Sequence, residues 1–356
     1  MPAQEAYRKP ELQDKDSWSM VIVPDPQNYV KYLRNQPLLD LMTAWIAENI
    51  DTLNIRMVLC TGDLVEQNDR VNRGLSGNVS SAKQWEAVAH SFSYLDGLTP
   101  YITATGNHDY TYDLQGKRSS RFRDYFPVDK NRLNRNIICQ DLPNEDGLSS
   151  LENSAYEFIS PHGVPFLFLT LAFAPRDTAL AWAHKIVNMS QYKHHKVILL
   201  THAYLNANNK RINTPVQVTC YQPYQENGDI LKRRQTLEDA NNGEQIWEKL
   251  VRESPNIELV VCGHIGGKDN FKAHVGFRTD DNKYGRKVNQ MVFNAQFMGG
   301  GHYGNGGDGW LRIVEFLPDG KTAKVRTFSP YFAISPTSRP FAWSREAFNE
   351  FSFTFD

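Results

Sequence analysis

Residues 56–66 read Arg-Met-Val-Leu-Cys-Thr-Gly-Asp-Leu-Val-Glu, an apolar run that ends abruptly in a glycine and an acidic residue. The run Arg56–Cys60 has the length and composition of a strand that is buried on both faces. Gly62 lets the backbone turn sharply, so Asp63 is presented directly beyond the strand. Because ligands bind at the carboxyl ends of strands in open α/β sheets, this stretch predicts such a sheet with a functional aspartate at its edge.

The same arrangement recurs along the chain. Polar residues that can bind a metal directly follow other apolar runs, namely Asp25 and Gln27 after Val23, Gly106-Asn107-His108-Asp109 after Thr105, His202 after Leu200, and Gly263-His264 after Cys262. Strands that share a direction bring their carboxyl ends to one edge of a sheet. We therefore expect these side chains to gather in one place.

Apolar spacing predicts the elements between these motifs. Buried strands are predicted at Met20–Val23, Arg56–Cys60, Tyr101–Thr105, Phe166–Leu171, Lys196–Leu200 and Glu258–Cys262. Helices are predicted from Pro37 to Ile50 and at Ala82–Leu95, Thr178–Met189 and Gly243–Val251. The last third predicts successive strands at Ala273–Phe277, Gln290–Ala295, Trp310–Phe316 and Thr322–Thr327, with a hairpin turn at 317–320. This alternation favours a layered α/β fold.

We expect a single domain over residues 20–330. An N-terminal tail would span 1–19, and a C-terminal extension over 331–356 would pack on the domain. The polar stretch Asn206–Asn242 is too long for an ordinary connection, and loops of this length carry function or are disordered.

Composition and charge narrow the class of protein. The 356 residues carry 39 basic and 40 acidic side chains, so the net charge is −1. This argues against a nucleic-acid partner, because such binding depends on many phosphate contacts. We expect no membrane span, since the sequence lacks a run of 18 apolar residues. Residues 1–19 are polar, as in a chain without a signal peptide or one whose leader has been removed.

The chemistry of the motif residues indicates a transition-metal site. Aspartate, asparagine and histidine together suit Mn, Fe or Zn better than calcium, which prefers oxygen ligands alone. Two such ions about 3.5–4 Å apart can clamp the attacking and leaving oxygens of a phosphoryl transfer, and they lower the pKa of bound water. We therefore expect two divalent metal ions as cofactors.

The motifs, taken in order, resemble the calcineurin-like metallophosphoesterase superfamily. The family pattern is Asp-x-His, Gly-Asp-x-x-Asp/Glu, Gly-Asn-His-Asp/Glu, His, Gly-His-x-His, and the matching pieces here run from residue 25 to 266. The resemblance implies an α/β fold with a central β-sandwich of mixed sheets flanked by helices. It also implies hydrolysis of a phosphoric ester by metal-bound hydroxide. Because many members are exported, a periplasmic or secreted location is favoured over the cytoplasm.

The resemblance implies a ligand role for five residues. Asp25 would hold the first metal, and Asp63 would bridge both metals. Asn107, His202 and His264 would hold the second metal.

The resemblance also implies a catalytic pair. His108 would contact the phosphate and protonate the leaving oxygen. Asp109 would orient His108 through its ring N–H. Glu66 would support the loop that carries the bridging aspartate rather than bind metal.

Two departures from the family pattern affect the first metal. Gln27 and Gly266 stand where the family has histidines. The first metal could be held by Asp25, Gln27, Asp63 and a substitute ligand, could arrive with the substrate, or could be dispensed with. We select His302 as the substitute, because it lies in the glycine-rich segment 299–309 just after a predicted strand; a solvated loop histidine is the alternative.

Residues near the motifs are candidates for binding the substrate. Tyr110 and Tyr204 follow metal ligands closely, and Arg73 and Arg118 follow the second and third motifs. An arginine here can bind a phosphate through two hydrogen bonds, although a surface ion pair is the alternative role.

The cysteines fit no zinc module. Cys60 and Cys262 end predicted strands and are expected to be buried thiols. Cys139 and Cys220 lie in predicted loops, where a disulfide between them is an alternative to two free thiols.

The function that we predict is metal-dependent hydrolysis of a small phosphodiester or phosphomonoester. Two rival functions are a degenerate member that binds metal or phosphate without turnover, and a scaffold that uses Asn206–Asn242 as its contact surface. The presence of His108 favours the enzyme, since a binding protein needs no acid.

Overall fold

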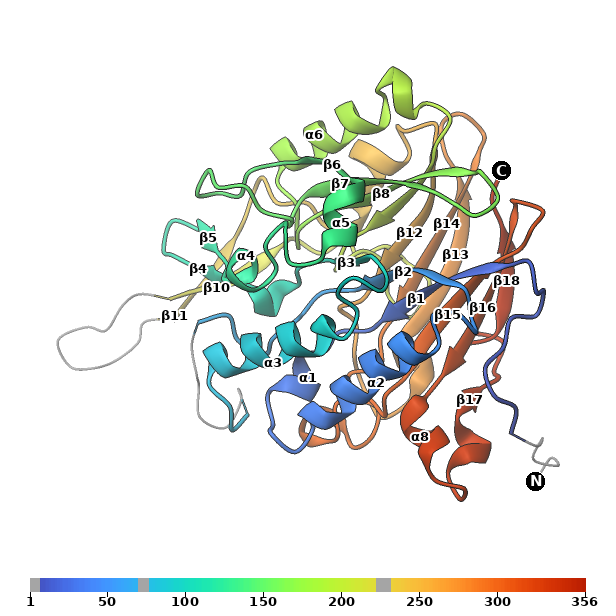
Figure 1. Cartoon of the computed structure of the whole chain (residues 1–356). Coiled ribbons are helices and arrows are strands. Elements are labelled where there is room, and N and C mark those ends of the chain that lie inside the picture. Colours follow the sequence, from blue (N-terminus) through green and yellow to red (C-terminus); the bar gives the residue numbers. More distant parts are fainter. Residues whose placement is uncertain (1–6, 70–76, 222–231) are drawn as a thin grey trace.

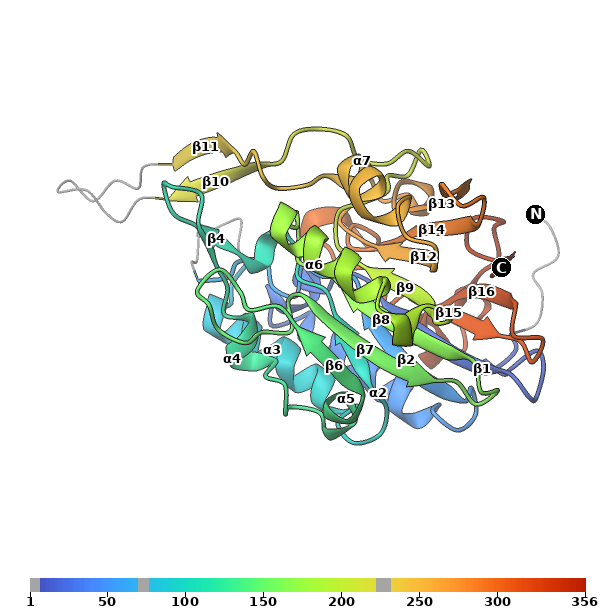
Figure 2. The same cartoon turned by 90° about the horizontal axis from the view of Figure 1, so that it is seen from above.

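The structure is a computed structural model that describes residues 7–69, 77–221 and 232–356. Within these residues the strands form two large sheets and one small sheet. The two large sheets pack face to face, and helices cover their outer faces (Figure 1 and Figure 2).

The first large sheet carries the N-terminal motifs. Its order is β17 (Trp343–Ser344), β16 (Thr322–Phe328), β15 (Leu311–Phe316), β1 (Trp18–Val23), β2 (Ile55–Cys60) and β3 (Tyr101–Thr103), and β18 (Phe351–Thr354) pairs with β16. β1, β2 and β3 are parallel to one another, whereas β15 is antiparallel to β1. The strands that precede the first three motifs therefore point the same way.

The second large sheet carries the histidine motifs. Its order is β13 (Val275–Asp281), β14 (Lys287–Phe293), β12 (Ile257–Cys262), β9 (Lys196–Leu200), β8 (Pro165–Thr170), β7 (Ser154–Ile159) and β6 (Ile138–Asp141). β8, β9, β12 and β14 run parallel. Their carboxyl ends consequently lie along one edge.

A small sheet lies beside the sandwich. Its order is β11 (Lys232–Thr236), β10 (Gln217–Tyr221), β4 (Thr111–Tyr112) and β5 (Arg118–Ser119). β10 and β11 form an antiparallel pair that projects from the body of the molecule in Figure 2. Part of the long polar stretch Asn206–Asn242 therefore forms strands.

Helices cover the sheets on both sides. The helices are α1 (Gln27–Val30), α2 (Gln36–Glu48), α3 (Ser81–Ser93), α4 (Phe122–Tyr125), α5 (Arg132–Ile137), α6 (Asp177–Val187), α7 (Gly243–Ile246) and α8 (Pro330–Ile334). A π-helical turn at Trp247–Val251 continues α7. Among the described residues, none of the helices combines the length and the apolar character needed to cross a lipid bilayer.

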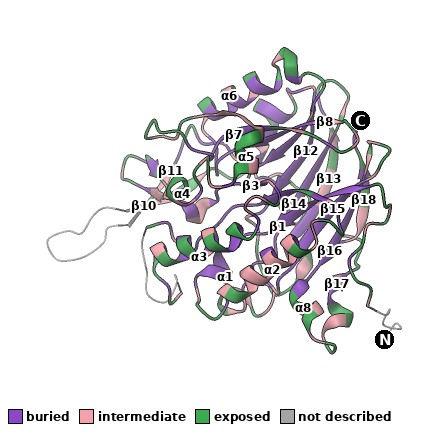
Figure 3. Cartoon of the chain, viewed as in Figure 1, coloured by how far each residue is buried: buried purple, intermediate pink, exposed green. Residues whose placement is uncertain are grey.

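Alternation of side chains along β1 shows how the layers are filled. Met20 and Ile22 enter the core between the two large sheets, whereas Val21 and Val23 pack in the core that α2 and α3 cover. Successive residues of a strand point to opposite faces, so one apolar run serves both layers. The buried residues in Figure 3 accordingly concentrate in the strands and on the inner faces of the helices.

The predicted fold class is confirmed: the chain is α/β, with mixed sheets in a central sandwich and helices outside. The predicted hairpin turn at 317–320 joins β15 and β16, which pair as antiparallel neighbours. The predicted helix Gly243–Val251 is instead a short α-helix followed by the π-helical turn. β6, β7 and β18 lie outside the strands that apolar spacing predicted.

Candidate metal centre

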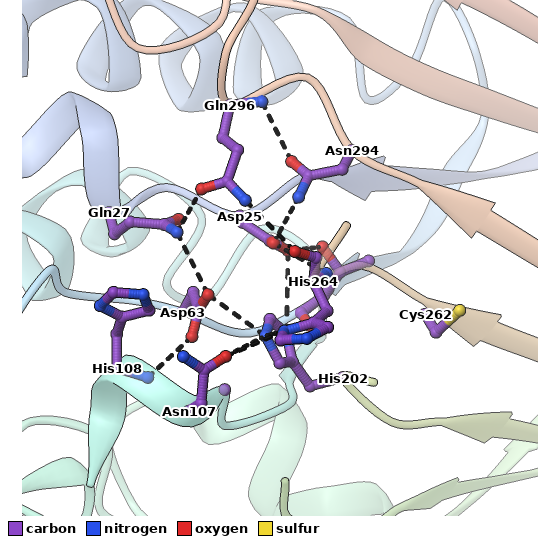
Figure 4. A network of polar contacts seen from close by, with 12 residues as sticks. Asp25, Gln27, Asp63, Asn107, His108, His202, Cys262, His264, Asn294 and Gln296 are labelled. Atoms are coloured by element: carbon purple, nitrogen blue, oxygen red, sulfur yellow. Dashed lines mark hydrogen bonds and ion pairs between the residues drawn. The ribbon is translucent and has the colours of Figure 1, made fainter. Parts of the chain in front are cut away.

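Motif residues from both large sheets meet at one edge of the sandwich, as Figure 4 shows. Each side chain comes from the end of a parallel strand: Asp25 after β1, Asp63 after β2, Asn107 after β3, His202 after β9, His264 after β12, and Asn294 and Gln296 after β14. Asn294 and Gln296 were not among the predicted site residues. The same strand-end pattern marks them, because the predicted strand Gln290–Ala295 ends there.

The second metal position is a compact group of donor atoms. His202 Nε2 lies 3.2 Å from Asp63 Oδ2 and 3.2 Å from Asn107 Oδ1. His264 Nδ1 lies 2.9 Å from Asn107 Oδ1 and 3.1 Å from His202 Nε2. Among the described residues, Asp63, His202 and His264 form a group that could hold a metal ion.

These distances fit a shared metal. Protein ligands lie about 2.0–2.2 Å from zinc, so neighbouring ligands on one ion are about 3 Å apart. The atoms that face one another are a carboxylate oxygen, an amide oxygen and ring nitrogens, all of which can donate electron pairs. His202 Nδ1 lies 2.8 Å from Thr61 O, a contact that leaves Nε2 to face the centre.

Burial and charge perturb the acids and bases of this group. Burial alone would raise the pKa of Asp63, but His202 and His108 hold that pKa well below its usual range. Burial works against the charged form of His202, yet Asp63 and Asp25 raise its pKa to about 9. Burial and the neighbouring His202 lower the pKa of His264 to about 3. A cation bound here would thus displace a proton from His202.

Asp25 is held by several donors. Its Oδ1 accepts a hydrogen bond from Thr61 Oγ1 at 2.6 Å. Its Oδ2 accepts from the His264 backbone N–H at 2.9 Å and from Asn294 Nδ2 at 2.5 Å. Complete burial nevertheless raises the pKa of Asp25 to about 6. A divalent ion beside it would stabilise the carboxylate that burial disfavours.

Gln27 and Gln296 contact each other beside Asp63. Gln27 Nε2 contacts Asp63 Oδ2 at 3.1 Å and also contacts Gln296 Oε1. Gln27 Oε1 is buried and has no hydrogen-bond partner among the described residues. At Gly266, a Cβ atom would lie 2.5 Å from the Phe297 ring and 3.2 Å from Gln296 Nε2. The Phe297 ring and Gln296 therefore fill the place of a side chain at position 266.

His302 contacts Lys31 and Glu66. Both of its ring nitrogens lie 3.1 Å from Lys31 Nζ, and its Nε2 lies 3.9 Å from Glu66 Oε1. The glycine-rich segment packs on α1, where a Cβ at Gly306 would lie 2.5 Å from the Tyr29 ring. Gln296 is the residue that contacts Gln27 in this structure, and the role of His302 as substitute ligand stays a prediction.

His108 is held in a way the sequence did not predict. Its backbone N–H donates to Asp63 Oδ1 at 2.9 Å, and its Nδ1 lies 2.8 Å from the backbone carbonyl of Glu66. Burial would lower the pKa of His108, but Asp63 and Glu66 raise it. The Glu66 carbonyl, rather than Asp109, thus orients the ring.

Asp109 holds the two ligand loops together. Its Oδ2 accepts from the Gly106 N–H at 2.7 Å and its Oδ1 from the Val65 N–H at 3.1 Å. Burial raises the pKa of Asp109 to about 7, and the charge of Asp63 adds to the shift. The predicted contact between Asp109 and His108 is replaced by this backbone clamp.

The predicted substrate-binding residues lie in different places. Tyr110 lines a cavity beside the site, and its hydroxyl donates to Glu152 at 2.6 Å. Tyr204 is fully buried in the core under α6, and its hydroxyl donates to Gln290 at 3.2 Å, so it cannot meet a substrate. Arg118 is also buried, paired with Glu145 at 2.9 Å and bonded to the Phe173 carbonyl. Arg73 lies outside the described residues.

The cysteines are free thiols. Cys60, Cys220 and Cys262 are buried, and Cys139 Sγ lies 3.1 Å from the Ala155 carbonyl. Burial raises the pKa of the Cys262 thiol to about 12, so it stays protonated beside the histidines. The alternative of a Cys139–Cys220 disulfide does not occur in this structure.

This chain resembles part of a longer protein. The chain is 27% identical over 326 residues to the uncharacterized protein YvnB of Bacillus subtilis (strain 168), covering 89% of this chain and 20% of that protein. The chain thus spans about a fifth of the length of this relative.

Solved structures with a similar course of the chain include a dimetal phosphatase from Danio rerio and GAP50 of Plasmodium. The first has a TM-score of 0.49 and 11% identity, with coverage of 95% of this chain and 99% of that chain. The second has a TM-score of 0.42 and 10% identity, with coverage of 96% and 89%. The model of the calcineurin-like phosphoesterase family matches residues 35–268, and the chain therefore belongs to this family.

Proposed function

We propose that this chain hydrolyses small phosphoric esters with the help of two divalent ions held at the edge of the sandwich. The observation that carries the proposal is the pair of donor groups joined by Asp63: its Oδ2 faces His202 and also Gln27. One carboxylate between two sets of ligands suits a binuclear centre. Mn, Fe and Zn fit this mixture of oxygen and nitrogen donors.

The second metal would be held by Asp63, Asn107, His202 and His264. The contacts of 2.9–3.2 Å among their donor atoms support this assignment. The centroid of the Phe173 ring lies 6.0 Å from the ring centroids of both His202 and His264.

The first metal would be held by Asp25, Gln27, Asp63 and Gln296. The unpartnered Oε1 of Gln27 supports this assignment. Rotating the Gln27 amide by half a turn exchanges the positions of its oxygen and nitrogen and hardly changes the shape of the side chain. In that orientation Oε1 would point toward Asp63. Gln296 would take the place of the histidine that the family has at position 266.

Different residues would have different roles in the reaction. Bound ions would neutralise the phosphoryl oxygens and acidify a water molecule. Thr61 and Asn294 hold Asp25 in position through the hydrogen bonds described above. His108, with Nδ1 engaged by the Glu66 carbonyl, keeps Nε2 for a proton that it gives to the leaving oxygen.

The test combines metal analysis with hydrolysis of bis-p-nitrophenyl phosphate and p-nitrophenyl phosphate in added manganese. We expect two metal ions per chain and turnover that EDTA abolishes. A chain that binds metal but hydrolyses neither ester with Mn, Fe or Zn would instead be a binding protein.

The role of His108 has a sharper test. His108→Ala should lower kcat about 10²–10⁴-fold on an alkyl phosphodiester, because an alkoxide needs a proton to leave. The loss should be much smaller on the p-nitrophenyl ester, whose phenolate leaves without one. His194→Ala, which removes an exposed histidine elsewhere, is the matched control. Equal losses on both esters would contradict the acid role.

A further inference from the structure

Two cavities border the proposed metal centre, one beside His108 and the other beside His264. The cavity on the His108 side has a volume of about 260 Å³, and the cavity on the His264 side has a volume of about 510 Å³. Asn107, Phe173 and Gln217 line both cavities. A phosphoryl group at the centre would therefore have room for a substituent in each cavity.

The His108-side cavity is lined by hydrogen-bonding groups. Asn68, Thr111, Gln217 and Thr219 contribute amides and hydroxyls. The acidic residues Glu66 and Asp69 also line this cavity. Amides and hydroxyls can both donate to and accept from hydroxyl groups of a ligand. We call this the polar cavity.

The His264-side cavity has an apolar wall, which half of its lining residues form. Ile212, Pro215, Val216 and Ala203 form its wall together with the Phe173 ring. An aromatic or aliphatic group would be removed from water there, and an aromatic one could pack on Phe173. We call this the apolar cavity.

The charge of the walls limits what these cavities accept. Within the described residues, neither cavity is lined by a lysine or an arginine. Additional phosphate groups on a substrate are usually bound by such side chains. Glu66 and Asp69 in the wall of the polar cavity would also repel an anion. We therefore expect that neither substituent carries a further phosphate.

We propose that the substrate is an asymmetric phosphodiester, with a hydroxylated alcohol that carries no further phosphate in the polar cavity and an apolar alcohol in the apolar cavity. This inference rests on the proposed function and names its substrate class. His108 lines the polar cavity and not the apolar cavity. The alcohol that receives its proton, and therefore leaves, is the hydroxylated one. A phosphomonoester would fill one cavity and leave the other to water.

The reaction balances as a hydrolysis. The oxygen of one water forms a bond to phosphorus, and the bond from phosphorus to the oxygen of the hydroxylated alcohol breaks. His108 gives its proton to that oxygen, and the proton lost by the attacking water restores His108 through solvent. The products are the free hydroxylated alcohol and the phosphomonoester of the apolar alcohol.

The experiment uses the metal-loaded chain and matched synthetic esters. The probe is benzyl 3-hydroxypropyl phosphate, with methyl 3-hydroxypropyl phosphate and 3-hydroxypropyl phosphate as references. The two alcohols of the probe have similar acidity, so neither is chemically the better leaving group. Which of the two phosphorus–oxygen bonds breaks therefore shows how the substrate is oriented in the site. We expect benzyl phosphate and propanediol as products, and a kcat/KM at least tenfold above that of either reference.

Two matched variants test the cavities separately. Val216→Trp fills the apolar cavity and should lower the benzyl-to-methyl ratio of kcat/KM at least tenfold. Thr219→Trp fills the polar cavity and should leave that ratio in place while lowering kcat/KM on both diesters. Leu98→Trp, at an exposed turn position, is the control for the added indole, and circular dichroism melts verify that each variant is folded.

The outcomes distinguish a failure of the substrate inference from a failure of the proposed function. Release of benzyl alcohol, equal rates on benzyl and methyl diesters, or preference for the monoester would overturn the substrate inference, whatever the variants do. Turnover of bis-p-nitrophenyl phosphate by the same preparation shows in that case that the proposed function survives. Absence of turnover on every ester would overturn both.

Discussion

Two of the proposed ligands have an unusual backbone conformation. Asp63 has a φ of 49° and His264 a φ of 70°, a region that residues other than glycine rarely occupy. The preceding glycines are also required, since a Cβ at Gly263 would lie 2.2 Å from Asp25 Oδ1. Local strain of this kind concentrates at functional sites, where the surrounding structure maintains it.

At the residue scale, the support given to Asp25 can be tested with two buried threonines. Thr61→Val removes the hydroxyl that donates to Asp25 Oδ1 while keeping the side-chain shape. We expect metal affinity to fall about tenfold or more, because ligand carboxylates depend on such donors. Isothermal titration with Mn measures this loss.

Thr201→Val is the matched control. The Thr201 hydroxyl is buried at the end of β9 and has no hydrogen-bond partner among the described residues. Replacing it with a methyl group should leave metal affinity unchanged and stability equal or higher. Similar affinity losses in both variants would point to general disturbance of the site rather than to the hydrogen bond.

Gln296 offers a second test at this scale. Gln296→Ala should reduce the metal content from two ions per chain toward one, because it removes a proposed ligand of the first metal only. Elemental analysis after dialysis measures the content. Gln115→Ala, a change in the turn before β5, serves as control; retention of two ions in Gln296→Ala would reassign the ligand.

At the element scale, the C-terminal strand completes the first large sheet. β18 pairs with β16 and places Phe353 in the core between the two sheets. Phe355, just beyond the strand, packs at a ring-centroid distance of 5.7 Å from Phe316. We propose that residues 331–356 belong to the folded domain as its packed extension.

Phe353→Ala should lower the free energy of unfolding by about 3–5 kcal/mol, as truncations of buried aromatics do. Urea denaturation measures the change. Ser352→Ala alters the exposed neighbour on the same strand and should change stability by less than about 0.5 kcal/mol. A small effect of Phe353→Ala would mean that β18 contributes little to the core.

The segment that leads into β10 is the other element with a functional consequence. Ile212, Pro215 and Val216 line the apolar cavity, and Thr219 in β10 lines the polar cavity. One continuous stretch thus contributes to both cavities. The functional role of the long polar stretch Asn206–Asn242 stays a prediction, and residues 222–231 of it lie outside the described residues.

At the scale of the whole molecule, the proposed metal centre would join the two large sheets. Asp25, Asp63 and Asn107 extend from the first sheet, whereas His202 and His264 extend from the second. Ions that bind both sets bind the folded chain far better than the unfolded chain. Binding of this kind stabilises the folded state by mass action.

Chelation should therefore lower Tm. An ion at one hundred times its Kd contributes about 2.7 kcal/mol, which in a chain of this size amounts to about 3–4 °C. Differential scanning fluorimetry with EDTA, and then with Mn restored, measures the shift. His202→Ala should respond much less to chelation, and an unchanged Tm in the parent chain would argue against ions that link the sheets.

Much of the fold followed from local patterns. Apolar runs located β1, β2, β9 and β12 within a residue or two, and helical spacing located α2, α3 and α6. β7, with its mixed sequence Ser-Ala-Tyr-Glu-Phe-Ile, was not predicted, because its partners β6 and β8 rather than its own apolar pattern make it a strand.

The sequence by itself determined which polar side chains follow the strands, because an apolar run followed by a glycine and a polar residue is a local pattern. It thereby indicated the metal chemistry and the family. Only the tertiary structure decided that Gln296 rather than His302 lies beside Gln27, that Tyr204 is buried, and that two cavities of different polarity border the proposed centre. The physical reason is that these relations depend on how two separate sheets pack, and spacing along the chain carries no information about distance across that interface.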